Sequence, residues 1–334
     1  FSTMPTYTGQ ITPNRKLLRL RIDRDTDIQL QLNSALKADE NAYLTLPDGW
    51  NFELTESEGN NKQRGRVSLP SSVRQGHYTI DAKVLEQEVF SAQTLAYPHI
   101  RSQTRFAKVS ADIALVDTAG LDGLRIGWID GGVDEAYHWA DQLGARIIQL
   151  DDKRMISGDF EGLDVIVAGV FAGAARPLNR SMQYIRPWIE FGGHFVSQYH
   201  RPIDNWDKTQ SSPLLLQPGS PSIRWRVTDA SAPVKILQPD HPLLKSPNRI
   251  ISEDFNGWVK ERGLYFASEW DSAYVPLFSM SDFGEAPLEG GLLAARIGAG
   301  SHVHCALNLF YQMDHMVVGA FRLFANLLTP SGSK

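Results

Sequence analysis

Cysteine is almost absent from this sequence of 334 residues, which contains Cys305 alone. One thiol cannot close a disulfide within the chain, so the sequence excludes a fold that disulfides hold together. The cysteine count leaves the cellular compartment open.

The chain also lacks an excess of basic residues and any long apolar run. Its 33 Lys and Arg against 38 Asp and Glu give a formal net charge of -5, without basic blocks. We therefore expect no nucleic-acid partner, since such a partner selects a basic face. No apolar stretch reaches the length of a membrane span, so we predict none. The chain begins with Phe1 rather than Met, and we expect a processed product or a piece of a longer protein.

Residues 1–110 have the pattern of short strands separated by turns. Segments 17–22 and 27–32 alternate apolar and polar side chains, which is the period of a half-buried strand. Pro47-Asp48-Gly49 has the composition of a turn. Residues 56–66 are polar, and we expect a mobile hairpin tip there. The pattern predicts an all-β, immunoglobulin-like sandwich domain.

From residue 111 onward, apolar runs alternate with helical spacing. Strand-like runs cover 124–129, 145–150, 164–170 and 194–199. Helical faces are spaced at i, i+3, i+4 and i+7 between and after these runs. Strand–helix alternation with nearly continuous apolar strands predicts a doubly wound α/β domain with a mostly parallel sheet over residues 111–334.

Residues 201–290 interrupt this pattern and predict an irregular, aromatic-rich insertion with some β structure. Trp and Tyr side chains such as Trp258 and Tyr265 alternate there with carboxylates such as Glu261. Aromatic faces beside carboxylates suit a sugar site. The same aromatics also suit a small core of the insertion, and we favour the core.

Ligands of parallel α/β sheets bind where the strands end, so the candidate site lies at that edge. The loops after the predicted strands bring a carboxylate, two arginines, an imidazole, amides and aromatic rings to it. These groups suit a polar, hydroxylated ligand, for instance a glycan. The candidate ligand-binding residues are Asp130, Gly131, Gly132, Phe171, Arg176, His200, Arg201, Asn308, Tyr311 and Gln312.

Complete catalytic and metal-binding motifs are missing. The segment after the third strand reads Gly169-Val170-Phe171-Ala172-Gly173, where a nucleophile elbow would need Ser or Cys in the middle. Cys305 lies in mid-strand and is expected to be a small core residue. His302 and His304 share one face of a strand, but no third metal ligand is apparent. We predict no catalytic residue, no metal and no cofactor.

The later part of the chain resembles a known family. Pro239-Asp240-His241-Pro242-Leu243-Leu244, the run 254–266 and the run 321–328 are similar to the C-terminal region of large PIG-L/LmbE-like deacetylases. Leu44 to Trp50 is similar to the sandwich module that precedes the α/β domain in those proteins. The resemblance implies a class I glutamine amidotransferase-like fold for the second domain. The zinc motif of the deacetylase domain, of H-P-D-D type, is absent from this sequence.

Together these observations predict a non-catalytic accessory portion of a PIG-L/LmbE-like sugar-amide deacetylase system, which serves glycan binding or complex assembly. A deacetylase domain or subunit would be its partner. The alternative is a hydrolase with an unrecognised site at the carboxyl edge of the sheet. Because large relatives of this type are exported, we expect a periplasmic or extracellular location.

Overall fold

The computed structural model describes residues 4–33, 36–37, 40–59, 61–97, 99 and 101–330. The chain forms two compact units, Phe1–Asp117 (unit 1) and Thr118–Lys334 (unit 2). The division comes after Asp117 rather than after residue 110, because Ser110–Val116 forms a strand of unit 1. Among the described residues, no helix has the length and apolarity that crossing a membrane requires.

Unit 1 consists of strands and turns. A four-stranded sheet has the order β1-β3-β6-β5, a second sheet has the order β2-β11-β7-β4 with β8 beside β7, and β9 pairs with β10. These strands are β1 (Gly9–Thr12), β2 (Arg15–Arg19), β3 (Asp25–Leu32), β4 (Ala42–Thr45), β5 (Asn51–Glu58), β6 (Lys62–Ser68), β7 (Gly76–Val84), β8 (Gln87–Glu88), β9 (Phe90–Leu95), β10 (Gln103–Lys108) and β11 (Ser110–Val116).

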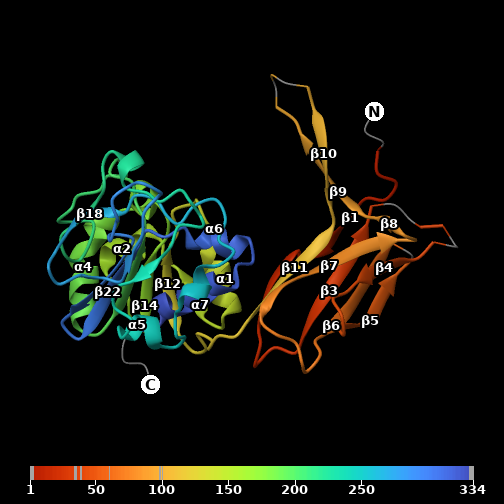
Figure 1. The fold of residues 1–334 in the computed structure, drawn as a ribbon, viewed down its shortest axis with the longest axis horizontal. Helices are drawn as coiled ribbons and strands as arrows, with labels where there is room; N and C mark the ends of the chain where they lie inside the picture. The colour runs from red at the N-terminus through yellow and green to blue at the C-terminus, as the bar shows by residue number, and fades with distance from the viewer. Residues whose placement is uncertain are drawn as a thin grey trace. The chain divides into compact units, whose positions relative to one another are not determined.

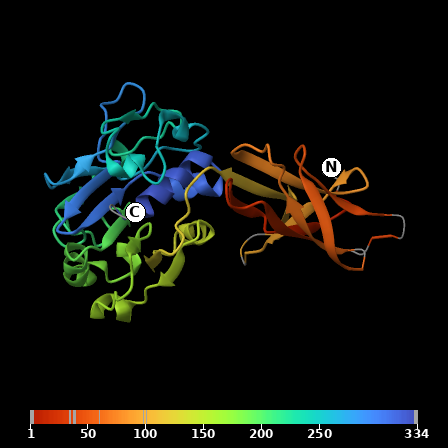
Figure 2. The same ribbon diagram turned by 90° about the horizontal axis from the view of Figure 1, so that it is seen from below.

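The two larger sheets of unit 1 lie against each other (Figures 1 and 2). Their buried side chains form one apolar core. The alternation in β3 buries Ile28, Leu30 and Leu32 on one face, and Ile80 and Ile113 of the other sheet join the same cluster. Burial of this apolar surface is the main stabilisation of the unit. The predicted hairpin at 56–66 is formed by β5 and β6, with residue 60 outside the described residues.

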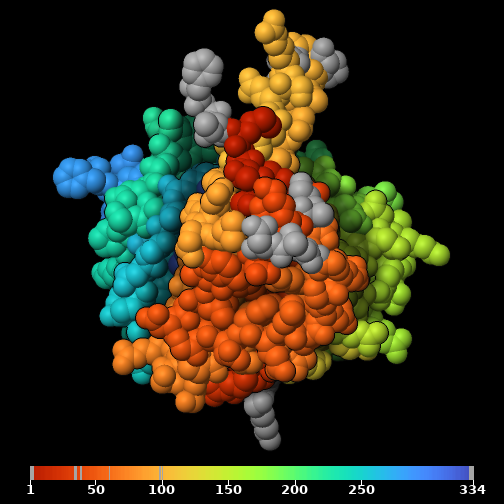
Figure 3. Space-filling view, turned by 90° about the vertical axis from the view of Figure 1, so that its right-hand side faces the viewer, coloured from red at the N-terminus to blue at the C-terminus, as the bar shows by residue number. Residues whose placement is uncertain are grey.

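The β9–β10 ribbon stands away from the body of unit 1 (Figures 1 and 3). Its two strands pair with each other from Phe90–Lys108 to Leu95–Gln103, and most of its side chains are exposed. The ribbon therefore contributes little to the shared core.

Unit 2 is built on a seven-stranded mixed sheet of order β13-β12-β14-β15-β22-β21-β19. Neighbours from β13 to β22 are parallel, whereas β21 and β19 run antiparallel to their neighbours. Two small sheets, β16-β18 and β17-β20, lie outside it. The strands are β12 (Arg125–Ile129), β13 (Arg146–Gln149), β14 (Val165–Ala168), β15 (His194–Gln198), β16 (Leu216–Pro218), β17 (Lys235–Ile236), β18 (Ala267–Trp270), β19 (Val275–Pro276), β20 (Phe278–Ser279), β21 (Leu292–Ile297) and β22 (Gly300–Cys305).

Helices lie on both sides of this sheet, with α2 and α4 on one side and α1, α6 and α7 on the other (Figure 1). Met182 and Ile185 of α4 pack with Phe195 of the sheet, while Trp139 of α1 meets Phe321 of α7 at 5.2 Å between ring centroids. The helices are α1 (Ala136–Gln142), α2 (Asp152–Ser157), α3 (Ala172–Ala175), α4 (Leu178–Glu190), η1 (Ser222–Arg224), α5 (Pro242–Lys245), η2 (Ser252–Phe255), α6 (Leu309–Asp314) and α7 (Val318–Leu328).

The predicted fold class was wrong. Strands account for 36% of the described residues and helices for 18%, and the strands are divided among several small sheets. The chain is therefore mostly β and not a doubly wound, glutamine amidotransferase-like α/β fold. Segment 201–290 adds short strands and only the one-turn helices η1, α5 and η2, and α1, α2 and α3 contain only 7, 6 and 4 residues. Apolar periodicity showed where strands and helices alternate, but it did not show how short those helices are.

Candidate functional site at the carboxyl edge of the sheet

The parallel strands β12, β14, β15 and β22 end at one edge of the sheet, here called the carboxyl edge. Backbone hydrogen bonds join the loops that follow them. The Phe171 N–H donates to the Tyr199 carbonyl at 3.2 Å, which joins the ends of β14 and β15. The Asn308 N–H donates to the Arg262 carbonyl at 3.0 Å, which brings a segment of the insertion to the end of β22. The edge is thus a fixed framework for the side chains described below.

The loop Asp130-Gly131-Gly132 after β12 is a tight turn. The Asp130 carboxylate accepts the Gly132 N–H at 2.7 Å, and Gly132 has a φ of +71°. A side chain at Gly131 would collide with the Val170 carbonyl, so glycine allows the backbones of two strand ends to approach. The turn accounts for the composition of this loop, and its role in ligand binding stays a prediction.

Asp134 is a buried carboxylate that the sequence analysis missed. It accepts hydrogen bonds from the backbone N–H groups of Ala136 at 2.9 Å and Val170 at 3.1 Å. Burial, with smaller contributions from the negative charges of Asp130 and Asp314, raises the pKa of Asp134 to about 6. The residue lies four positions after Asp130, but nothing in the local sequence indicated its burial.

An aromatic cluster, here called the Phe171 cluster, consists of Phe171, Tyr199, Tyr265 and Arg201. The Phe171 ring meets Tyr199 at 5.5 Å and Tyr265 at 6.0 Å between centroids, both edge-on, and the Arg201 guanidinium lies 4.3 Å from its centre. Asp204 is nearly fully buried and fixes Arg201 through contacts of 2.7 and 2.8 Å. The cluster combines flat apolar faces with a cation at the predicted edge.

Phe171 itself has a strained backbone at the turn from β14 into α3, with a φ of +57°. This left-handed conformation at a strand-to-helix turn is where a nucleophile elbow exposes its Ser or Cys. The side chain here is a phenyl ring, which cannot attack a substrate. Cys305 is no substitute, because it is fully buried and burial raises the pKa of its thiol to about 12.

Three buried polar atoms at this edge have no hydrogen-bond partner within the described part of the chain: Trp128 Nε1, Asn308 Oδ1 and His200 Nε2, of which the first two lie beside carboxylates. The Asn308 amide donates from Nδ2 to the Glu261 carboxylate at 2.6 Å, and since a carboxylate only accepts, the amide oxygen is the free end. Trp128 lies beside Asp134, because a Cβ at Gly169 would stand 3.3 Å from Trp128 Nε1 and 3.6 Å from Asp134 Oδ2.

The Tyr199 hydroxyl is influenced by both carboxylates named above, Asp134 beside Trp128 and Glu261 beside Asn308. Tyr199 is largely buried, and burial, followed by the negative charges of Glu261 and Asp134, raises the pKa of its phenol. Both carboxylates therefore act on the same hydroxyl, which remains protonated at physiological pH and can donate a hydrogen bond.

Four predicted site residues already have partners inside the protein. Arg176 donates to Asp152 at 2.6 Å and to the Leu150 carbonyl at 2.7 Å. Gln312 is fully buried and bonds the backbone of Val259 at 2.8 and 2.9 Å. These side chains hold neighbouring loops in place. The Tyr311 ring lies beneath Lys260 and against His315. The His200 Nδ1 is 2.8 Å from the Gln198 carbonyl, and its ring meets Trp206, which also contacts His304.

A separate group of histidines, here called the histidine network, is a buried chain of hydrogen bonds on the α4 side of the sheet. Its links are Ser212–Tyr274 at 3.2 Å, Tyr274–His302 at 2.6 Å, His302–Ser197 at 2.9 Å and Ser197–His304 at 2.9 Å. Burial lowers the pKa of His304 to about 3 and of the neighbouring His200 to about 4. Within the described residues, no three His, Cys, Asp or Glu side chains are grouped to hold a metal ion.

Five of the ten aromatics of the 201–290 segment are buried: Phe255, Trp258, Phe266, Tyr274 and Phe278. Tyr274 belongs to a small cluster with Leu216 and Leu293, and Phe266 is fully buried. Tyr265, by contrast, joins the Phe171 cluster. The sequence alone could not divide these residues between a core and a site.

No family model and no curated protein matches this chain. Among solved structures, 63% of the chain is similar to the exo-β-1,4-mannosidase Op5Man5 from Opitutaceae bacterium strain TAV5, with 14% identity, a TM-score of 0.35 and 36% of that chain covered. A β-galactosidase from Rahnella sp. R3 is similar over 63% of this chain and 31% of its own, with 13% identity and a TM-score of 0.29.

A family 123 glycoside hydrolase from Clostridium perfringens is similar over 65% of this chain and 42% of its own, with 10% identity and a TM-score of 0.17. The chain thus spans less than half the length of each of these enzymes. Likeness at this level leaves the function to be argued from the residues of the chain itself. The resemblance to PIG-L/LmbE-like deacetylases stays a prediction.

Proposed function

We propose that unit 2 binds a neutral carbohydrate at the carboxyl edge and does not hydrolyse it. The observation that carries the proposal is the pair of buried, partnerless atoms, Trp128 Nε1 and Asn308 Oδ1. A buried donor or acceptor without a partner costs about 1–3 kcal/mol. A ligand hydroxyl can both accept and donate, so one polyhydroxylated molecule is suited to satisfy an indole N–H and an amide oxygen together.

The surrounding residues support a sugar more than an anion or an apolar molecule. The carboxylates of Asp134 and Glu261 would repel an anionic ligand and can accept hydrogen bonds from hydroxyl groups. The Phe171 cluster supplies aromatic faces on which the apolar side of a sugar ring can stack. Small-molecule sites usually combine aromatic surface with a small number of polar groups, as this edge does.

The proposal is limited to binding because the two positions at which a Ser or Cys nucleophile was sought do not supply one. Phe171 occupies the strained turn, and the Cys305 thiol is buried and protonated. Hydrolysis by the carboxyl groups of Asp134 and Glu261 is the alternative that the assay below tests. We further propose that such a binding portion serves a sugar-amide deacetylase system of the PIG-L/LmbE type, supported by the resemblance of residues 239–244, 254–266 and 321–328. A periplasmic or extracellular location belongs to the same proposal.

The test is isothermal titration of the full chain with lactose, mannobiose, cellobiose and di-N-acetylchitobiose. Trp128→Phe removes the indole N–H and retains an aromatic ring, and Tyr265→Ala removes part of the cluster. We expect each to weaken binding about tenfold, which corresponds to about 1.4 kcal/mol. Arg176→Lys is the matched control, because its guanidinium is already occupied by Asp152, and should bind like the parent chain.

Absence of binding by all four probes, or unchanged affinity in both variants, would overturn the proposal. Release of reducing sugar in proportion to chain concentration would instead favour the hydrolase alternative. Near-UV circular dichroism of each variant establishes that a lost affinity does not come from a lost fold.

A further inference from the structure

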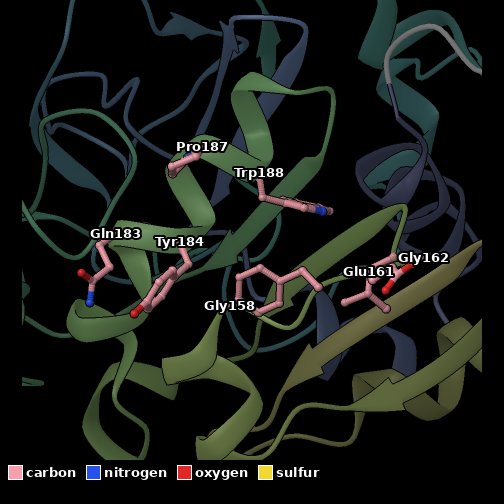
Figure 4. A pocket seen from close by; sticks show the side chains of 9 residues that line it. Gly158, Glu161, Gly162, Gln183, Tyr184, Pro187 and Trp188 are labelled. Carbon is pink, nitrogen blue, oxygen red and sulfur yellow. The ribbon is translucent and has the colours of Figure 1, made fainter.

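A cleft away from the carboxyl edge combines two aromatic rings with free polar groups (Figure 4). Its volume is about 410 Å³, within the range of small-molecule sites. It lies between the loop that leads into β14 and the second half of α4. The lining residues are Gly158, Phe160, Glu161, Gly162, Leu163, Gln183, Tyr184, Pro187 and Trp188. We propose that this cleft is a second carbohydrate site, which stacks a neutral sugar ring on Tyr184 and Trp188.

The rings come from one face of α4, since Tyr184 and Trp188 are four residues apart. Two glycines pack closely against these rings. A Cβ at Gly158 would stand 2.8 Å from the Tyr184 ring, and one at Gly193 would collide with the Trp188 ring. Gly158 also has a φ of +71°, so the close approach and the turn both require glycine. Platforms held this way lose little freedom when a ligand stacks on them.

Phe160 completes the apolar part of the cleft. Its ring meets Trp188 edge-on, at 6.3 Å between centroids and 70° between planes. Phe160 is buried, whereas Tyr184 is 37% exposed. The floor is therefore fixed by the core, and the rim aromatics are accessible.

Polar groups at the cleft are free to bind a ligand. Within the described residues, the Trp188 indole N–H, the Tyr184 hydroxyl and the Glu161 carboxylate make no hydrogen bond or ion pair. Pro187 lies inside α4 and has no N–H to donate to the Gln183 carbonyl, which leaves that carbonyl without its helical donor. The cleft thus offers donors from two rings and acceptors from a carboxylate and a carbonyl.

The arrangement of these groups matches a sugar ring. Figure 4 shows Gln183 at one end of the cleft and Glu161 at the other, with Tyr184 and Trp188 between them. A sugar placed on the rings would direct its equatorial hydroxyls toward the two ends. The Glu161 carboxylate disfavours anionic sugars, which makes the expected ligand neutral.

This inference stands on different residues from the carboxyl-edge proposal, so the two can fail separately. The experiment follows indole N–H signals in ¹H–¹⁵N spectra of the full chain during titration with lactose, mannobiose and cellobiose. The Trp188 signal is assigned by its loss in Trp188→Phe. We expect at least one probe to shift this signal in a saturable manner, and Trp128→Phe to leave that shift unchanged.

Three variants sharpen the result. Tyr184→Ala should weaken the probe affinity measured at Trp188 about tenfold, and Glu161→Ala should weaken it about threefold. Phe191→Ala is the matched control, because Phe191 is a 91% exposed aromatic at the end of the same helix but does not line the cleft.

A Trp188 signal that no probe moves would overturn the inference, as would an affinity that Tyr184→Ala leaves unchanged. If Trp188 responds to chain concentration rather than to sugar, the cleft is instead a contact between two copies, and the inference is also overturned. If the Trp128 indole signal does not shift with sugar while the Trp188 signal does, the result counts against the carboxyl-edge proposal and not against this one.

Discussion

The two units differ most in what they bury. Of the 22 buried polar or charged residues in the described part of the chain, one, Thr26, belongs to unit 1 and 21 belong to unit 2. Unit 1 keeps its charged pairs at the surface, as in the contacts of Lys108 with Asp81 and Glu88, both at 2.8 Å. Apolar burial alone thus suffices for the sandwich, whereas unit 2 depends on polar groups that satisfy one another inside.

This difference has a structural reason. Two sheets packed face to face can direct their charged side chains outward along every strand. In unit 2, loops of the 201–290 segment cross over the sheet, and their backbone groups need buried partners. Arg262, for example, is 4% exposed and donates to the carbonyls of Ala232 and Phe255. A buried guanidinium of this kind stabilises an irregular segment that has no sheet to pair with.

Acidic pH should destabilise unit 2 much more than unit 1, and this is the largest difference that we expect between the two units. Burial lowers the pKa of His194 and of His200 to about 4 and of His304 to about 3, and it lowers the pKa of His302 well below the ordinary value of 6.5. Below pH 6.5 the unfolded chain binds protons that the folded chain rejects. Stability of unit 2 is therefore present above pH 6.5 and is lost as the pH falls toward 4, by about 1.4 kcal/mol per pH unit for each histidine.

Asp134 opposes this trend, because its raised pKa lets the folded chain take up one proton as the pH falls through about 6. Burial also raises the pKa of Asp254, which acts in the same direction as Asp134. Two carboxyl groups against five imidazoles, with the lowered pKa of His241 included, leave a net loss. The measurement is pulsed hydrogen exchange with mass spectrometry after equilibration at pH 7.5 and 4.5, with the labelling pulse kept at one pH. Strands β14 and β15 should lose protection at pH 4.5, while β7 and β11 retain it. Equal loss in both units would show that the buried histidines do not decide acid stability.

Asn326 should be the most sensitive single amide in unit 2. Its side chain accepts the Asn248 N–H at 2.9 Å and donates to the carbonyls of Leu243 and Asn248, both at 2.7 Å. Asn326→Leu nearly keeps the side-chain volume but leaves these buried backbone groups unpaired. We therefore expect the free energy of unfolding, measured with urea, to fall by about 3 kcal/mol. Thr26→Val in unit 1 is the matched control, with an expected change below about 0.5 kcal/mol. Similar values for the two variants would contradict the contrast between the units.

Ser197→Ala should destabilise the protein less than Asn326→Leu does. It removes the hydroxyl in the middle of the histidine network. His302 and His304 each lose one partner, and we expect a loss of about 2 kcal/mol in the free energy of unfolding. Ring ¹⁵N shifts of both histidines should change as well, which a purely steric effect would not produce. Ser279→Ala is the control, because Ser279 is buried and its hydroxyl makes no side-chain hydrogen bond among the described residues. An equal loss in the control would mean that the network adds nothing.

Lys108→Ala in unit 1 should have the smallest effect. Its ammonium contacts two carboxylates, but it is 38% exposed and the partners are 25% and 42% exposed. Surface ion pairs of this kind contribute at most about 1 kcal/mol, and added salt weakens them. Thermal unfolding in 0.05 and 0.5 M NaCl should show a small difference between Lys108→Ala and the parent that disappears at high salt. A large, salt-independent loss would mean that unit 1 depends on polar contacts after all.

The sequence indicated the positions of strands and helices better than the tertiary surroundings of individual side chains. Alternation in β3 and the apolar run of β14 were visible because side-chain period is a local property. The overall class was wrong, because helix length and the short strands of 201–290 depend on tertiary packing. At the edge of the sheet, Phe171 and Asn308 were found from topology, whereas Arg176 proved to be engaged with Asp152.

The other residues of the candidate site could not be predicted from the sequence. They are Asp134, Glu261, Tyr199 and Trp128. Their significance comes from burial and from missing partners, and neither property can be read from neighbouring residues. A carboxylate at the start of a helix is an ordinary cap in a sequence, and only the fold raises its pKa.

The histidine network also carries a direction. Each of its links contains one hydrogen, and a neutral imidazole that donates at one nitrogen accepts at the other. If Tyr274 donates to His302, then His302 must donate to Ser197 and Ser197 to His304; if His304 donates first, every link is reversed. Any mixed order leaves a buried hydrogen without an acceptor or a lone pair without a donor. These three links therefore have two uniform proton orders that convert as a whole, and His304 Nε2 lacks a partner among the described residues in both. The tautomer of His304 thus reports on the hydroxyl of Tyr274 three links away.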